Sequence, residues 1–171
     1  MSTIYTGVDN GLEGGVVSIS GNTVIGKHRF IKTNLRWGNQ ISVPPLKAYF
    51  DALINAHPTL RHFVLIEEPL KQFGGKTTAQ SIQSTGASFG KIVGVVELVQ
   101  VGNDLAYDTV IPRSWQTTFF KPGGDTKAKS IAAATRLFPE ADFRVSALAK
   151  GPHDGFTDAC LIAEHARRSC L

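Results

Sequence analysis

Three short apolar segments, separated from one another by helical patterns, constrain the fold of this chain more than any other feature. They span residues 4–9, 62–66 and 105–111, and each is bounded by polar or turn-forming residues. Short apolar runs of this kind are typical of buried strands. Because strands that alternate with helices carry those helices on the faces of one sheet, the sequence predicts an α/β fold with a mixed sheet flanked by helices.

The remaining elements follow from local signals. Gly21-Asn22 is a two-residue hairpin signal between β-favouring segments at 15–20 and 23–31. Apolar residues at helical spacing, with proline or aspartate near several of the starts, predict helices at 46–54, 81–99, 112–119, 125–138 and 156–168. Since no repeat, linker or change in composition divides the chain, we expect one domain over residues 1–171.

Composition limits the class of protein. The 171 residues are 42% hydrophobic, enough for one core, and their net charge of +4 permits a polyanionic partner without requiring one. The two cysteines, Cys160 and Cys170, form neither a secreted disulfide framework nor a zinc motif. The N-terminus has no signal-peptide pattern, and no stretch approaches the roughly 18 apolar residues that span a bilayer. We therefore expect a soluble, cytoplasmic protein with no membrane partner.

Acidic residues follow two of the predicted strands. Asp9 ends the first, before Asn10 and Gly11, and Glu67 with Glu68 ends the 62–66 strand. An ordinary turn is the alternative for Asp9, because Asp, Asn and Gly are the usual turn residues. If the two strands are neighbours, Asp9 and Glu67 meet at one edge of the sheet, whereas Glu68 faces the opposite side because strand side chains alternate. Two carboxylates so placed repel each other unless a cation compensates.

A third acidic segment opens the final predicted helix. Asp154 and Asp158 are four residues apart and so share one helix face. The alternative is that Asp154 caps the helix and Asp158 pairs with a solvent cation. Carboxylates without a Cys or His cluster favour a hard cation, so the sequence predicts Mg²⁺, with Mn²⁺ as substitute, and two ions could hydrolyse a phosphodiester. Without these four acids the remaining chain has a net charge of +8, which suits a nucleic-acid backbone.

The acids lie in motifs that, together and in this order, resemble those of the RuvC-like Holliday junction resolvases, especially the phage-type members of this RNase H-like branch. The motifs are GVDNGLEGG, LIEEP, VIPRSWQ, GGDTKAKS and HDGFTDACLIAEHARR, with the long 81–99 helix between the second and third. The resemblance implies an RNase H-like mixed five-stranded sheet and a magnesium-dependent endonuclease, with two metal ions per site, that cuts four-way DNA junctions by symmetric nicks. It also implies a bacterial cell or a phage-infected host as the location.

The resemblance also assigns residues. Asp9, Glu67 and Asp158 match the metal-binding acids, Asp154 is similar to the partner acid on the final helix, and Lys129 matches a lysine near the scissile phosphate. The sequence departs from the family at Asn10, where a proline is common, and at Gly155, where an acid or histidine usually stands three residues before the last aspartate. Helical spacing favours Asp154 as the fourth ligand, and His153 is the alternative.

The family resemblance further implies a homodimer that binds branched DNA. Phe73 is similar to an aromatic that stacks on junction bases, with a packed loop anchor as the alternative, and Lys127 and Lys129 are expected phosphate contacts. The 81–99 helix, with Gly86, Gly90 and Gly94, corresponds to an element near the family's dimer interface; contact of these glycines with the sheet is the alternative. Two other activities stay open: a nuclease for flaps, Y-forks or three-way junctions, and a non-catalytic junction-binding protein. A two-domain ATP-binding fold does not fit within 171 residues.

Overall fold

The computed structural model describes residues 3–35, 38–69, 79–121 and 123–169. Five strands form one mixed sheet in the order β3-β2-β1-β6-β7. β1 pairs with β6 in parallel, β6 with β7 in parallel, and β1, β2 and β3 are antiparallel. The strands are β1 (Thr3–Asp9), β2 (Gly15–Ser20), β3 (Thr23–Arg29), β6 (Arg61–Glu67) and β7 (Leu105–Val110). The predicted mixed five-stranded sheet is thus confirmed.

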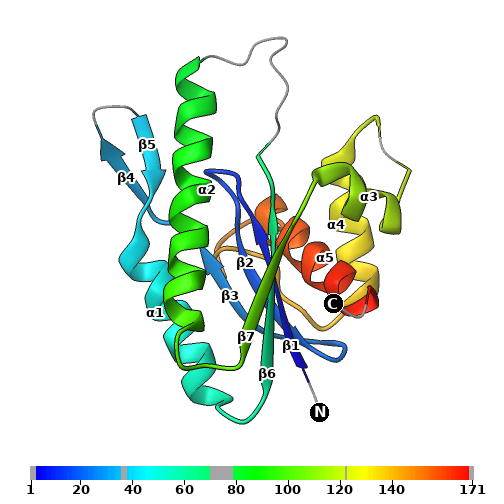
Figure 1. Cartoon of the computed structure of the whole chain (residues 1–171). Coiled ribbons are helices and arrows are strands. Elements are labelled where there is room, and N and C mark those ends of the chain that lie inside the picture. Colours follow the sequence, from blue (N-terminus) through cyan, green and yellow to red (C-terminus); the bar gives the residue numbers. More distant parts are fainter. Residues whose placement is uncertain (1–2, 36–37, 70–78, 122, 170–171) are drawn as a thin grey trace.

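Helices cover both faces of this sheet (Figure 1). On one face lie α1 (Val43–Ala56) and α2 (Ala79–Gln100), and on the other lie α3 (Pro112–Phe119), α4 (Thr126–Leu137) and α5 (Asp154–Arg168). Each face has its own apolar cluster. Phe50 of α1 and Ile92 of α2 belong to one cluster, and Phe138, which follows α4, and Leu161 of α5 belong to the other. None of the described helices is long and apolar enough to cross a bilayer.

Local signals explain where several elements begin and turn. Gly21, in the β2–β3 turn, has a φ of 57°, which a residue without Cβ adopts easily. Proline occupies the first turn of α1 and of α3, where the missing N–H is not needed. The Asp125 side chain caps α4 by accepting a hydrogen bond from the Ala128 amide at 3.0 Å. Cys160 is fully buried, as expected of a small apolar residue, and Cys170 lies outside the described residues.

A second, two-stranded sheet was not predicted from the sequence. The expected strand at 23–31 ends at Arg29, and β4 (Lys32–Leu35) pairs with β5 (Gly38–Ile41) in an antiparallel hairpin. All four residues of β4 are exposed, so the hairpin lacks the alternation of apolar and polar residues that identifies a strand. Side chains of α2 tie the hairpin down: Ser88 Oγ accepts from the Ile41 amide at 3.3 Å, and Ser84 donates to the Asn39 carbonyl.

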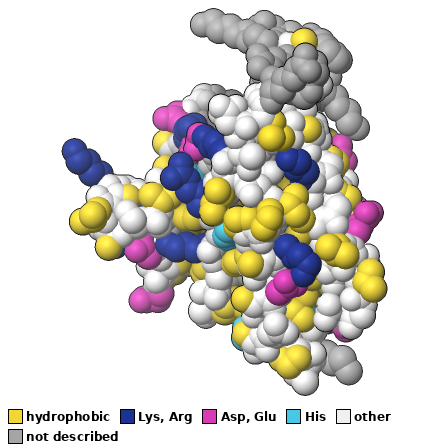
Figure 2. Space-filling view, turned by 90° about the vertical axis from the view of Figure 1, so that its left-hand side faces the viewer, with side chains coloured by type: hydrophobic (Ala, Val, Ile, Leu, Met, Phe, Trp, Pro, Cys, Tyr) yellow, Lys and Arg dark blue, Asp and Glu magenta, His cyan; other side chains and the backbone are white. Residues whose placement is uncertain are grey.

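The glycines of α2 do not contact the sheet. Among the residues that the structure describes, a Cβ atom built on Gly86, Gly90 or Gly94 meets no heavy atom within 4 Å, and all three glycines are exposed. The alternative that these glycines pack against the sheet is therefore wrong. Figure 2 shows the side of the molecule that carries β4, β5, α1 and α2, where apolar side chains gather between Lys and Arg side chains.

Candidate active site

The first two acids lie side by side at one edge of the sheet. The β1–β6 register pairs Val8 with Ile66, so Asp9 and Glu67 come next on adjacent parallel strands. The third acid comes from α5, which packs directly on β1. At Gly7 a Cβ atom would stand only 2.0 Å from the Ala159 carbonyl oxygen. The missing side chain lets α5 approach closely enough for its acids to reach those of the sheet.

Burial and mutual repulsion make these carboxyl groups hard to ionise. Burial, followed by the neighbouring Asp9 carboxylate, raises the pKa of Glu67 to about 8. Burial likewise raises the pKa of Asp158 to about 7, with Asp9 and Asp154 adding to the effect. Burial also raises the pKa of Asp9, against a hydrogen bond of 2.9 Å from the Gly11 amide to its Oδ1. The three predicted acids from β1, β6 and α5 therefore form one electrostatically coupled cluster.

Two buried side chains that sequence reasoning had not assigned to the site hold these acids. The indole N–H of Trp115 in α3 donates to Glu67 Oε1 at 2.8 Å. The Ser130 hydroxyl in α4 donates to Asp158 Oδ1. Both residues stand in quoted motifs, VIPRSWQ and GGDTKAKS, and that position is the signal that could have pointed to them.

The fourth acid is paired with a lysine. Asp154 is the first residue of α5, His153 is the N-cap, and Lys127 Nζ forms an ion pair with Asp154 Oδ2. The Lys127 ammonium lowers the pKa of Asp154 and also acts on Asp9 and Asp158. Burial lowers the pKa of His153, whose Nδ1 has no hydrogen-bond partner among the described residues. Asp154 thus stands within electrostatic reach of the other acids, as its spacing predicted.

The other predicted residues have different positions. Lys129 Nζ donates to the carbonyl oxygens of Lys121 at 3.1 Å and Gly123 at 2.6 Å, and so closes the loop before α4. Phe73 lies outside the described residues. Glu68 accepts a hydrogen bond of 2.9 Å from Thr109 Oγ1 and lines a cavity of about 390 Å³ together with residues of α2, which confirms that it faces the side opposite Glu67.

A small cluster of charges borders the acids. Glu13, in the loop that follows Asp9, accepts from Arg29 Nη2 at 3.1 Å and also pairs with Lys32. Both contacts lower the pKa of Glu13. Arg29 and Glu13 also act electrostatically on His153, which places this cluster beside the start of α5.

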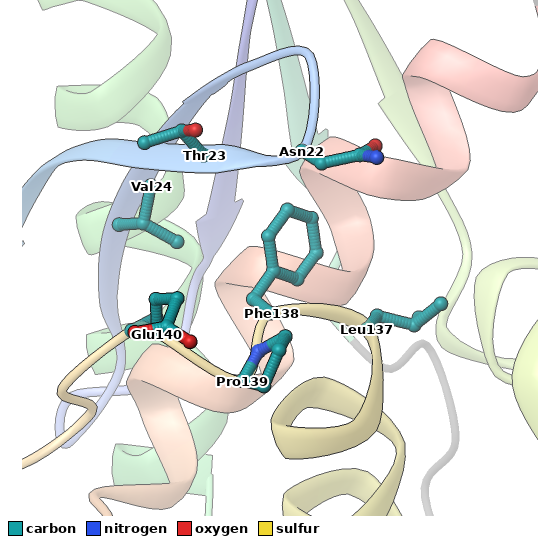
Figure 3. Close-up of a pocket in the computed structure, with 8 residues that line it drawn as sticks. Asn22, Thr23, Val24, Leu137, Phe138, Pro139 and Glu140 are labelled. Atoms are coloured by element: carbon teal, nitrogen blue, oxygen red, sulfur yellow. The ribbon is translucent and has the colours of Figure 1, made fainter.

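A groove separate from the acid cluster lies at the far end of the sheet. In the β1–β2 pairing, Asp9 faces Gly15 and Tyr5 faces Ile19, so the β2–β3 turn is at the opposite end from the acids. The groove has a volume of about 300 Å³ and lies between that turn and the end of α4 (Figure 3). Its lining consists of Asn22, Thr23, Val24, Leu137, Phe138, Pro139, Glu140 and Ala141.

The donor set of the acid cluster fits a hard divalent cation. All four candidate ligands are carboxylates, the groups that Mg²⁺ prefers. Asp9 and Glu67 lie within hydrogen-bonding reach of each other, so a proton or a cation must stand between them. As the side chains stand, no group of three or more Asp, Glu, His or Cys residues in the described ranges is arranged to hold a metal ion. The carboxylates would have to regroup around the ion.

The mixed sheet, helices on both faces and acids at adjacent strand ends define the RNase H-like class of fold. No protein-family model and no curated protein matches the sequence. Among solved structures, the chain is similar to T. thermophilus RuvC in complex with a Holliday junction substrate (TM-score 0.60, 10% identity, 98% of this chain and 96% of that chain). A second Thermus thermophilus RuvC structure gives a TM-score of 0.57 at 12% identity, over 99% and 97% of the two chains. The chain therefore has the RuvC fold over nearly its whole length.

Proposed function

We propose that this protein is a divalent-metal-dependent endonuclease that resolves four-way DNA junctions. The observation that carries the proposal is the coupled cluster of Asp9, Glu67 and Asp158, which come from three separate elements. Buried carboxylates that repel one another cost stability, so their presence calls for a cation. The RuvC fold supports the choice of substrate, since one of the similar structures contains a Holliday junction.

The chain's own residues would divide the work as follows. Asp9, Glu67, Asp154 and Asp158 would hold two Mg²⁺ ions, with Mn²⁺ as substitute. Bound ions of this kind lower the pKa of a water and stabilise the leaving oxygen of a phosphodiester. Lys127 stands beside Asp154 and can offer its ammonium to a DNA phosphate. In-line attack by water would leave a 5′-phosphate at each of two symmetric nicks.

A homodimer would place two such sites on one junction. The exposed glycines of α2 support this proposal, because a stripe without side chains allows close approach of a second helix. Exposed apolar surface on the same helix adds to it: Leu98 is 56% exposed. On the family resemblance alone, we further propose that Lys129 contacts a phosphate and Phe73 a junction base.

Asp9→Asn tests the proposed site. The change removes a ligand and leaves the basic surface intact, so we expect cleavage of a synthetic four-way junction to fall by at least a thousandfold while junction binding stays within about threefold. Cleavage is measured with Mg²⁺, Mn²⁺ and EDTA. Undiminished cutting by Asp9→Asn would refute the site.

The same assay separates the alternatives. Four-way, three-way, flap and linear substrates are compared with the unaltered protein. Cleavage of flaps and three-way junctions as fast as that of four-way junctions would favour the broader branched-DNA nuclease. Tight junction binding without cleavage in either metal would favour a non-catalytic junction-binding protein.

A further inference from the structure

Two buried hydrogen-bond donors, Trp115 and Ser130, contact the acid cluster from outside it. They come from α3 and α4, whereas the acids they contact belong to β6 and α5. Each donor is 1% exposed, so neither can exchange its contact for one with bulk water. Because packing fixes the position of each donor, each can hold one oxygen of its carboxylate in place.

Trp115 is suited to orienting a carboxylate. Its indole N–H can donate but cannot accept, so it binds an oxygen of Glu67 at 2.8 Å and leaves the other oxygen free to face Asp9 or an ion. The ring packs edge-on against Phe120, with centroids 6.2 Å apart and an interplanar angle of 87°. Proline at the start of α3 sets the direction of that helix after β7.

Ser130 has the same relation to Asp158. It lies on the buried face of α4, next to α5, and its hydroxyl donates to Asp158 Oδ1. Serine favours a helix interior less than alanine does, so helix formation does not explain its presence there. The hydrogen bond to the acid does explain it.

We propose that Trp115 and Ser130 are positioning residues that each hold one oxygen of Glu67 and of Asp158, so that the other oxygen can turn toward a divalent metal ion. This inference rests on the proposed function, because it assumes that the acids bind metal. Outer hydrogen-bond partners of metal ligands commonly change metal affinity about 10- to 100-fold when they are removed. Their effect is on the ligands, and neither residue needs to touch DNA.

Metal binding by the DNA-free protein provides the test. Trp115→Phe removes the N–H and keeps an aromatic ring, and Ser130→Ala removes the hydroxyl from a helix that tolerates alanine well. Calorimetric titration with Mn²⁺ should give a dissociation constant raised about tenfold or more for each variant. Thr135→Ala, at an exposed position of the same helix α4, is the matched control and should leave the constant unchanged. Thermal melts show whether each variant is folded at the temperature of the titration. If Trp115→Phe is unstable, Ser130→Ala alone tests the positioning role.

Fluorescence gives a second readout. The chain has two tryptophans, so Trp37→Phe leaves Trp115 as the only indole. Its emission should change as Mn²⁺ is added, in step with the calorimetric binding curve. Suppose that the unaltered protein binds metal and cuts junctions. Dissociation constants of both variants within twofold of its value would then overturn the positioning role alone. Absence of both metal binding and cleavage in the unaltered chain would overturn the proposed function, and this inference with it.

Discussion

Glu67→Gln removes one negative charge from the acid cluster and keeps nearly the same side-chain shape. The amide oxygen can still accept the 2.8 Å hydrogen bond from Trp115. The amide nitrogen can donate to Asp9, which lies within hydrogen-bonding reach. The substitution therefore isolates the electrostatic cost of a buried carboxylate, and we expect it to stabilise the metal-free protein while abolishing cleavage.

The magnitude follows from the pKa of Glu67, which burial and Asp9 raise from 4.5 to about 8. Because the folded state then holds its proton more tightly than the unfolded state, the stability of the unaltered protein falls as pH rises from about 4.5 to about 8. One pH unit corresponds to about 1.4 kcal/mol. Relative to a protein with Glu67 protonated in both states, the free energy of unfolding is therefore lower by about 4 kcal/mol at pH 8 and by about 1 kcal/mol at pH 5. For a chain of this length, about 4 kcal/mol corresponds to a rise in Tm of about 10 °C for Glu67→Gln at pH 8.

Thermal and urea unfolding in EDTA, at intervals from pH 5 to pH 8.5, measures this difference. Glu68→Gln is the matched control, since Glu68 follows Glu67 directly and faces the other side of the sheet. The control should show no gain that grows with pH. A Glu67→Gln protein that is less stable than the unaltered one at pH 8, or a difference independent of pH, would refute the electrostatic reasoning.

Three further predictions use other parts of the structure. Gly7→Ala should destabilise the protein by about 3 kcal/mol in urea unfolding, because the new Cβ would overlap the backbone of α5, which cannot move without opening the core. A change below about 1 kcal/mol would contradict that packing. A Cβ atom at Gly90 meets no heavy atom of the described residues within 4 Å, so Gly90→Gln should leave the Tm unchanged or higher. It should nevertheless shift the proposed dimer toward monomer in sedimentation experiments, and an unchanged mass would exclude the α2 stripe from the interface. Glu13→Gln frees Arg29 and Lys32 from their carboxylate. It should raise junction affinity several-fold at low salt and make that affinity depend more steeply on salt concentration. Binding equal to that of the unaltered protein at every salt concentration would rule out a DNA contact at this cluster.

Several features of this protein were readable in the sequence because they depend on short-range pattern. The apolar runs that became β1, β6 and β7 are recognisable from composition and length, and Asp9 and Glu67 stand where two of them end. The four-residue spacing of Asp154 and Asp158 is enough to put both on one face of α5. The acidic cluster was predictable because each acid occupies a fixed position on a regular element.

The partners of those acids depended on the tertiary structure. The sequence did not mark Trp115 as a partner of Glu67, and the family resemblance singled out Lys129, whereas the structure places Lys127 beside Asp154. The strands β4 and β5 had no apolar alternation to reveal them. Each of these features depends on which elements lie next to one another: α3 beside β6, α4 beside α5, and the hairpin against α2. Local periodicity fixes the face on which a side chain lies, but the side chain it meets is decided only when distant segments pack together.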